Sequence, residues 1–136
     1  MKVRFLYPRP PSYRDQSQLS TVIHVILSPA AGVAEMPSLL RGEAISPPDA
    51  ENIGSRNYAE TAAAVVTGAG YDDAAFEEMR EACRKESNVS WLRPDMSKAA
   101  PPPGPGYGEA MVERVKVCLR ELAEGGKSKG DGVYFY

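Results

Sequence analysis

The chain has 136 residues, with 16 basic and 18 acidic side chains and a formal net charge of -2 at pH 7. This length suits one folded domain around one core, and the balance of charges gives no general attraction to nucleic acid or to an anionic membrane. Because nowhere do about 18 apolar residues follow one another, we expect neither a nucleic-acid partner nor a membrane partner.

The first twenty residues differ in composition from the rest of the chain. Residues 2–7 have the character of an edge strand, and Pro8, Pro10 and Pro11 end it. The polar stretch Ser12–Ser20 has neither helical nor strand periodicity. We therefore expect residues 1–20 to be a proline-rich, poorly ordered or edge segment, and residues 21–136 to form a single α/β domain.

The next elements give the first strong signals of regular structure. Thr21–Leu27 is a β-branched run that is apolar on both faces, which is typical of a central parallel strand covered by helices on each side. Ser28–Gly32 then reads as a turn, and Val33–Arg41 as a short helix that ends at Gly42. Pro37 is expected to confine this helix to its second half or to fall within its first turn.

The remaining chain continues to alternate between strand and helix patterns. Strands are expected at Ala62–Thr67, Asn88–Leu92 and Gly132–Tyr136. Between them we expect a helix over 72–86, which begins at Asp72 or Asp73, and a helix of about five turns over 107–122. This order predicts a three-layer, Rossmann-like α/β domain with a mostly parallel sheet of four or five strands. The order of the strands stays open.

Cys83 and Cys118 each fall on the apolar side of an expected helix. A free thiol in such a position behaves as a small hydrophobic side chain, and unpaired cysteines are typical of a reducing compartment. We expect a cytoplasmic protein.

The carboxyl ends of parallel strands meet at one edge of a sheet, where small ligands bind. Trp91-Leu92-Arg93-Pro94-Asp95 places an arginine and a carboxylate at such an end, beside an indole. These residues would clamp an anionic or planar ligand, or they would form a structural salt bridge with Trp91 in the core. The candidate ligand-binding residues at this edge are Ser28, Gly68, Gly70, Tyr71, Arg93 and Asp95.

Gly68-Ala69-Gly70 lies between a strand and a helix, as a dinucleotide-binding loop does. The third glycine of G-x-G-x-x-G is absent because position 73 is an aspartate, and Asp72 and Asp73 would repel a phosphate. NAD(P) is therefore disfavoured, and any cofactor is unknown. The alternative to a dinucleotide-binding loop at Gly68–Gly70 is a turn followed by a helix cap.

No catalytic constellation is evident, so the catalytic residues are unknown. His24, the single histidine, lies between Ile23 and Val25, where a hydrogen-bonded core or sheet residue is favoured over a general base, and a multi-histidine zinc site is excluded. Ser28 lacks the G-x-S-x-G context of a nucleophile elbow, and no tyrosine is followed by lysine four positions later. No metal site is expected.

Four segments resemble a group of small fungal proteins with a Rossmann-like fold and no established activity: Gly68–Tyr71, Trp91–Asp95, Gly104–Gly108 and Gly132–Tyr136. The resemblance covers about Thr21 to Tyr136 and implies an initial strand and helix that would carry nucleotide-binding glycines. Met1–Ser20 departs from this pattern, and loss of that first unit would expose the neighbouring strand. By analogy, the resemblance implies that some such genes sit near fungal secondary-metabolite clusters and that the protein has an accessory biosynthetic role.

Two functions follow as hypotheses. The first is a non-catalytic or accessory Rossmann-like protein that binds a small molecule or a partner, in fungal secondary metabolism. The second is a truncated or divergent oxidoreductase-like enzyme that acts on a small metabolite. The possible partners are a small-molecule ligand, and a second copy or another protein that covers the exposed sheet edge.

Overall fold

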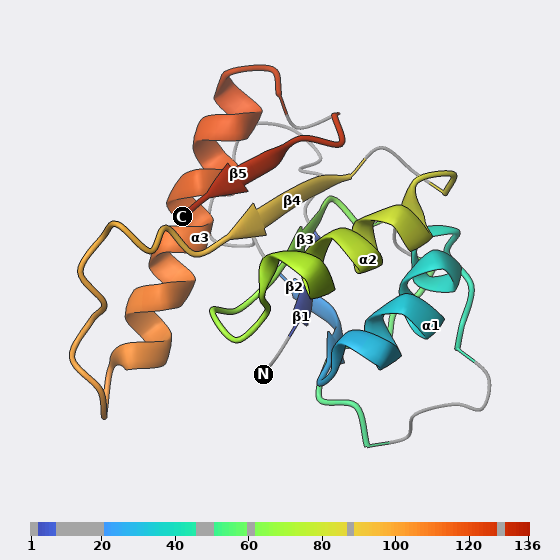
Figure 1. The fold of residues 1–136 in the computed structure, drawn as a ribbon, viewed down its shortest axis with the longest axis horizontal. Coiled ribbons are helices and arrows are strands. Elements are labelled where there is room, and N and C mark those ends of the chain that lie inside the picture. Colours follow the sequence, from blue (N-terminus) through green and yellow to red (C-terminus); the bar gives the residue numbers. More distant parts are fainter. Residues whose placement is uncertain (1–2, 8–20, 46–50, 60–61, 87–88, 128–129) are drawn as a thin grey trace.

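The computed structural model describes residues 3–7, 21–45, 51–59, 62–86, 89–127 and 130–136. The described residues form five strands and three helices, and from β2 onward strands and helices alternate (Figure 1). Their bounds are β1 Val3–Tyr7, β2 Thr21–Ile26, α1 Pro29–Leu40, β3 Ala64–Val66, α2 Asp73–Cys83, β4 Ser90–Arg93, α3 Tyr107–Glu124 and β5 Val133–Phe135. The predicted strands and helices from residue 62 onward are confirmed, each with slightly shorter or shifted bounds.

The sheet has the strand order β2-β1-β3-β4-β5. β3, β4 and β5 are parallel, as the sequence predicts for an α/β fold. β1 is antiparallel to both of its neighbours, β2 and β3. Two of the four strand pairings are therefore antiparallel, and the sheet is less parallel than the sequence predicts.

The sequence predicts an edge position in the sheet for the N-terminal strand and a central position for the strand at Thr21–Leu27, and both predictions are wrong. The N-terminal strand lies inside the sheet, paired on both sides, whereas β2 lies at the edge. The apolar sequence of β2 predicts a buried strand, and Ile23, Val25 and Ile26 are indeed buried. Their burial does not require a central position in the sheet, because the helices and a loop along the outer side of β2 cover these residues. Residues 1–2 and 8–20 of the proline-rich segment lie outside the described residues.

Helices cover both faces of the sheet (Figure 1). On one face, α1 and α2 bury a cluster that includes Ile23, Val65 and Val89. On the other face, α3 packs Val115 and Leu122 against the remaining side chains of β3 and β4. Successive side chains of a strand point to opposite faces, so neighbouring residues of β3 belong to different clusters.

The loop that follows α1 covers the outer side of β2. The Asn52 side chain takes the place of a neighbouring strand, because its Oδ1 accepts from the Val25 amide at 3.0 Å and its Nδ2 donates to the Val25 carbonyl at 2.7 Å. The amides of Ser55 and Arg56 donate to the carbonyls of Val22 and Ile23 at 2.8 and 2.9 Å. Along Val22, Ile23 and Val25, the outer side of β2 is thus hydrogen-bonded to the chain's own loop.

Gly54 allows this loop to approach so closely. A Cβ atom at this position would clash with the carbonyl oxygen of Ile23, which belongs to the backbone and has little freedom to move. Glycine at this position is required by the backbone of β2 rather than by a turn.

Helix α1 begins four residues before the sequence predicts. Ser28 is its N-cap, with Oγ accepting from the Ala31 amide at 3.2 Å, and Pro29 occupies the first turn, where its missing N–H costs nothing. Pro37 lies inside the helix, contrary to the prediction. Its missing hydrogen bond costs free energy, which burial of Met36 and Leu39 against the core offsets.

Gly32 gives a first test of this packing. A Cβ atom here would lie 2.5 Å from Sδ and 3.1 Å from Cγ of Met79, which is fully buried in α2. We expect Gly32→Ala to lower the free energy of unfolding by about 1 to 2 kcal/mol, because overpacking outweighs the gain in helix propensity. Urea denaturation measures the change.

Gly108→Ala is the matched control, because nothing lies within 4 Å of a Cβ atom at this position in α3. It should leave the stability unchanged or raise it by up to about 1 kcal/mol. Equal effects of the two substitutions would contradict a close contact between α1 and α2.

Candidate functional site

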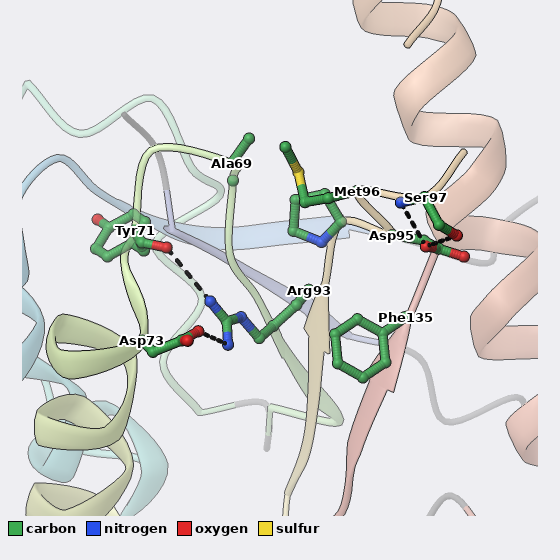
Figure 2. A pocket seen from close by; sticks show the side chains of 10 residues that line it. Ala69, Tyr71, Asp73, Arg93, Asp95, Met96, Ser97 and Phe135 are labelled. Carbon is green, nitrogen blue, oxygen red and sulfur yellow. Dashed lines mark hydrogen bonds and ion pairs between the residues drawn. The ribbon is translucent and has the colours of Figure 1, made fainter. Parts of the chain in front are cut away.

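A pocket of about 370 Å³ opens at the carboxyl ends of β3 and β4, beside the end of β5. Its lining comes from the turn after β3, the first turn of α2, the segment after β4 and the last strand (Figure 2). The lining residues are Gly68, Ala69, Tyr71, Asp73, Arg93, Pro94, Asp95, Met96, Ser97 and Phe135. We call it the Arg93 pocket.

Arg93 crosses the pocket from the end of β4 toward α2 (Figure 2). Its Nη1 donates to Asp73 Oδ1 at 2.7 Å and its Nη2 donates to the Tyr71 carbonyl at 3.4 Å. The guanidinium carbon lies 4.3 Å from the centre of the Phe76 ring, a cation–π contact. The arginine side chain is 19% exposed, whereas that of Asp73 is 90% exposed.

This arrangement contains the structural contacts expected at Arg93. Trp91 is buried, and its ring packs edge-on against Phe76 with 5.6 Å between the ring centres. The ion pair to Asp73 contributes little to stability because an exposed carboxylate gains little by pairing. The guanidinium is thus held in place mainly by stacking on Phe76, with an acidic partner that solvent reaches freely.

Asp95 is bound within its own turn. Its Oδ1 accepts from the Ser97 hydroxyl at 2.6 Å and from the Ser97 amide at 3.0 Å. These hydrogen bonds, together with the charges of Lys98 and Arg114, lower the pKa of Asp95 below its ordinary value. Asp95 therefore stays ionised at neutral pH, and its contacts hold the segment that forms one wall of the pocket.

Two exposed apolar side chains flank the polar groups. Met96 is 78% exposed and Phe135 is 58% exposed, and Figure 2 shows them on either side of the space beside Arg93. Large apolar side chains beside a held guanidinium offer contacts to the faces of a flat ligand.

The structure brings together four of the six residues predicted for a site, namely Gly68, Tyr71, Arg93 and Asp95. Gly70 belongs to the same turn but is not among the residues that line the pocket. Ser28 caps α1 after β2, and within the described residues it does not line this pocket.

Tyr71 contributes its backbone rather than its hydroxyl group. Its ring points away from Arg93 (Figure 2) and is 4% exposed, in the cluster under α1 and α2. Among the described residues its hydroxyl has no hydrogen-bond partner, and burial raises the pKa of Tyr71 above its ordinary value.

The N-terminus of α2 is occupied by the chain's own carboxylates. Asp72 is the N-cap, and its Oδ1 accepts from the Ala75 amide at 2.8 Å. Asp73 occupies the first turn. A phosphate placed there would meet two negative charges instead of free amides, in agreement with the turn and helix cap inferred from the sequence as the alternative to a dinucleotide loop.

A second polar cluster escaped the sequence analysis. His24 is fully buried, its Nε2 lies 3.0 Å from Glu35 Oε2, and its Nδ1 lies 3.0 Å from the Tyr58 hydroxyl. Asn52 Nδ2 is 3.2 Å from the same Nε2. This bears out a buried, hydrogen-bonded histidine, but its partners come from a helix and a loop with no spacing pattern that links them.

Other reactive groups add little. Within the parts of the chain that the structure describes, no three histidine, cysteine or acidic side chains come together as metal ligands. Both cysteines are free and buried, as predicted. Each described helix is too short or too polar to cross a lipid bilayer.

Comparison with known proteins finds one informative relationship. The chain is 36% identical over 121 residues to Kojic acid related protein 6 of Aspergillus oryzae, a match that covers 84% of this chain and 70% of that protein. No family model and no solved structure matches the chain.

The Tyr71 hydroxyl, which is buried and has no hydrogen-bond partner among the described residues, leads to a stability prediction. A buried hydroxyl without a partner loses its hydration on folding, at a cost of about 1 to 3 kcal/mol. We expect Tyr71→Phe to keep or raise the free energy of unfolding, by up to about 1 to 2 kcal/mol, measured by urea denaturation. A clear loss of stability would mean that the hydroxyl has a partner in the folded protein.

Cys83 leads to a pH prediction. Burial, with a smaller contribution from the charge of Glu86, raises the pKa of its thiol from about 9 to about 12. The folded state holds this proton more tightly than the unfolded chain, so the stabilisation is complete below pH 9 and is lost as the pH rises toward 12. Denaturation at pH 8 and pH 10 should show a smaller loss for Cys83→Ala than for the wild type; equal losses would contradict the raised pKa.

Proposed function

This chain belongs to the family of Kojic acid related protein 6, and on that premise we propose that it is a non-catalytic, Rossmann-like binding protein with an accessory role in fungal secondary metabolism. Its ligand is a small, flat, anionic metabolite that binds in the Arg93 pocket. A cytoplasmic location is part of this proposal.

The observation that carries the proposal is the state of Arg93. Its guanidinium is held over Phe76 and is mostly buried, yet its acidic partner Asp73 is almost fully exposed. A ligand anion can replace the Asp73 carboxylate on the same Nη1 while that carboxylate returns to water at little cost. Because the arginine is already ordered, less conformational entropy is lost on binding than at a free surface arginine.

The shape of the site supports a flat ligand. A volume of about 370 Å³ lies within the range of small-molecule sites. Met96 and Phe135 supply apolar surface beside the guanidinium. A planar ring with an acidic oxygen would pack against these side chains and present that oxygen to Arg93.

The name of the relative suggests a first probe. It associates that protein with kojic acid. Kojic acid is a small hydroxylated pyranone, a flat ring with a weakly acidic enol. For this chain, the name of the relative serves only to choose kojic acid as the first ligand to test. The competing hypothesis is a truncated or divergent oxidoreductase-like enzyme. A dinucleotide bound by such an enzyme at the glycine turn after β3 would meet the carboxylates of Asp72 and Asp73.

The test is a calorimetric titration with kojic acid and with benzoate, a flat carboxylate, against benzyl alcohol as a neutral ligand of similar size. We expect benzoate, and kojic acid at a pH where its enol is ionised, to bind and Arg93→Gln to weaken both at least tenfold, since a charge-assisted hydrogen bond contributes about 1.5 to 3 kcal/mol. A ligand at 100 times its Kd should also add about 2.7 kcal/mol of stability.

Arg80→Gln is the matched control. Arg80 lies 6.0 Å from the same Phe76 ring but does not line the pocket, so its substitution should change affinity less than twofold. Equal binding by wild type and Arg93→Gln would refute the site. Turnover of a reduced nicotinamide cofactor that depends on Arg93 would favour the enzyme instead.

A further inference from the structure

The ion pair between Arg93 and Asp73 occupies the group that the proposed ligand needs. Arg93 Nη1 donates to Asp73 Oδ1 at 2.7 Å, and Figure 2 shows this contact where the first turn of α2 borders the Arg93 pocket. Among the residues that line the pocket, Arg93 is the one that carries a positive charge. In the folded chain that charge is therefore already paired with a carboxylate of the same chain.

The charges of the lining oppose an anion for as long as Asp73 stays on Arg93. The lining carries two carboxylates, Asp73 and Asp95, and one guanidinium. Asp95 has positive charges of its own nearby, because Lys98 Nζ lies 3.8 Å from its Oδ2 and the charge of Arg114 also acts on it. An anion that approaches Arg93 thus meets the repulsion of the Asp73 carboxylate on the same guanidinium.

Asp73 can leave Arg93 at a small cost in free energy. The N-cap of α2 is Asp72, which accepts from the Ala75 amide at 2.8 Å, so Asp73 is not needed as the cap. The Asp73 side chain is 90% exposed, and an exposed carboxylate loses little when its partner is taken away. In the first turn of α2 it also keeps its favourable interaction with the helix dipole.

Arg93 has contacts that hold it without Asp73. Its guanidinium carbon lies 4.3 Å from the centre of the Phe76 ring, and its Nη2 donates to the Tyr71 carbonyl at 3.4 Å. These contacts leave the guanidinium in place when the carboxylate moves away. Loss of a competitor strengthens ligand binding, whereas loss of a residue that positions Arg93 weakens it, so the two roles predict changes of opposite sign.

We propose that Asp73 is an internal competitor of the ligand, which occupies Arg93 Nη1 and which an anionic ligand must displace in order to bind. Asp73 thereby sets the affinity of the Arg93 pocket for anions. A neutral ligand does not replace the carboxylate and leaves the ion pair intact. This inference rests on the proposed function, because it requires the Arg93 pocket to be the ligand site.

The experiment is a calorimetric titration of the full chain with benzoate and with benzyl alcohol. We expect Asp73→Asn to raise the affinity for benzoate at least fivefold and to change the affinity for benzyl alcohol less than twofold. Asparagine removes the charge but keeps an oxygen that accepts from Arg93, so the guanidinium stays in place. If Asp73→Asn does not fold, Asp73→Ala carries the same expectation, because alanine suits a helix.

Glu81→Gln is the matched control. It removes one negative charge from the same helix, where Glu81 is 64% exposed and lies 2.7 Å from Arg84, the same distance that separates Asp73 from Arg93. Glu81 does not line the pocket. Its substitution should change the affinity for benzoate less than twofold, and a gain as large as that of Asp73→Asn would overturn the role of Asp73.

The outcomes separate this inference from the proposed function. If Arg93→Gln weakens benzoate but Asp73→Asn leaves its affinity unchanged or lowers it, Asp73 is no competitor and the proposed function stands. If Arg93→Gln leaves the affinity unchanged, or if neither the wild type nor Asp73→Asn binds benzoate, both are refuted. Binding that appears only in Asp73→Asn, and is lost when Arg93→Gln is added, supports the competition.

Discussion

The outer side of β2 is the constraint on which much of this structure depends. A strand at a sheet edge has unpaired amides and carbonyls, which invite association with other chains unless they are covered. Here residues 52–56 cover them, through the Asn52 side chain on Val25 and through backbone hydrogen bonds to Val22 and Ile23. Because the same loop carries Tyr58 and Asn52 to His24, covering the edge also assembles the buried polar cluster.

Local patterns in the sequence were sufficient to predict the helices and strands that bury a single apolar stripe or face. The helix over α2 was identifiable from its N-cap Asp72 and from Phe76, Met79 and Cys83 at helical spacing, and all three side chains are buried. The convergence of Gly68 and Arg93 followed from the rule that parallel strands end at one edge. These inferences need only short-range information.

The remaining features depend on pairings between distant segments. An apolar run on both faces of β2 indicates burial, but it does not distinguish a central strand from an edge strand that a loop covers. Pro37 looked like a helix boundary, yet tertiary packing of Met36 and Leu39 overrides the local cost. The partners of His24 lie 11, 28 and 34 residues away, so no motif length connects them.

Strand direction explains where two of the pockets open. β2 runs in the same direction as β3 and β4, since β1 is antiparallel to both β2 and β3. The Arg93 pocket and a pocket of about 430 Å³ lined by Ile26, Leu27 and Glu35 therefore both open at carboxyl ends of strands. β1 lies between β2 and β3 and separates the two pockets.

The place of β1 also joins the two ends of the sheet, since it pairs with β2 on one side and with β3 on the other. On the face under α1 and α2, one core cluster crosses this junction, from Ile23 of β2 and Met36 of α1 to Val65 of β3 and Met79 of α2. A core shared in this way couples the unfolding of its parts, so that the amides of β2 and β3 exchange with solvent in the same cooperative opening.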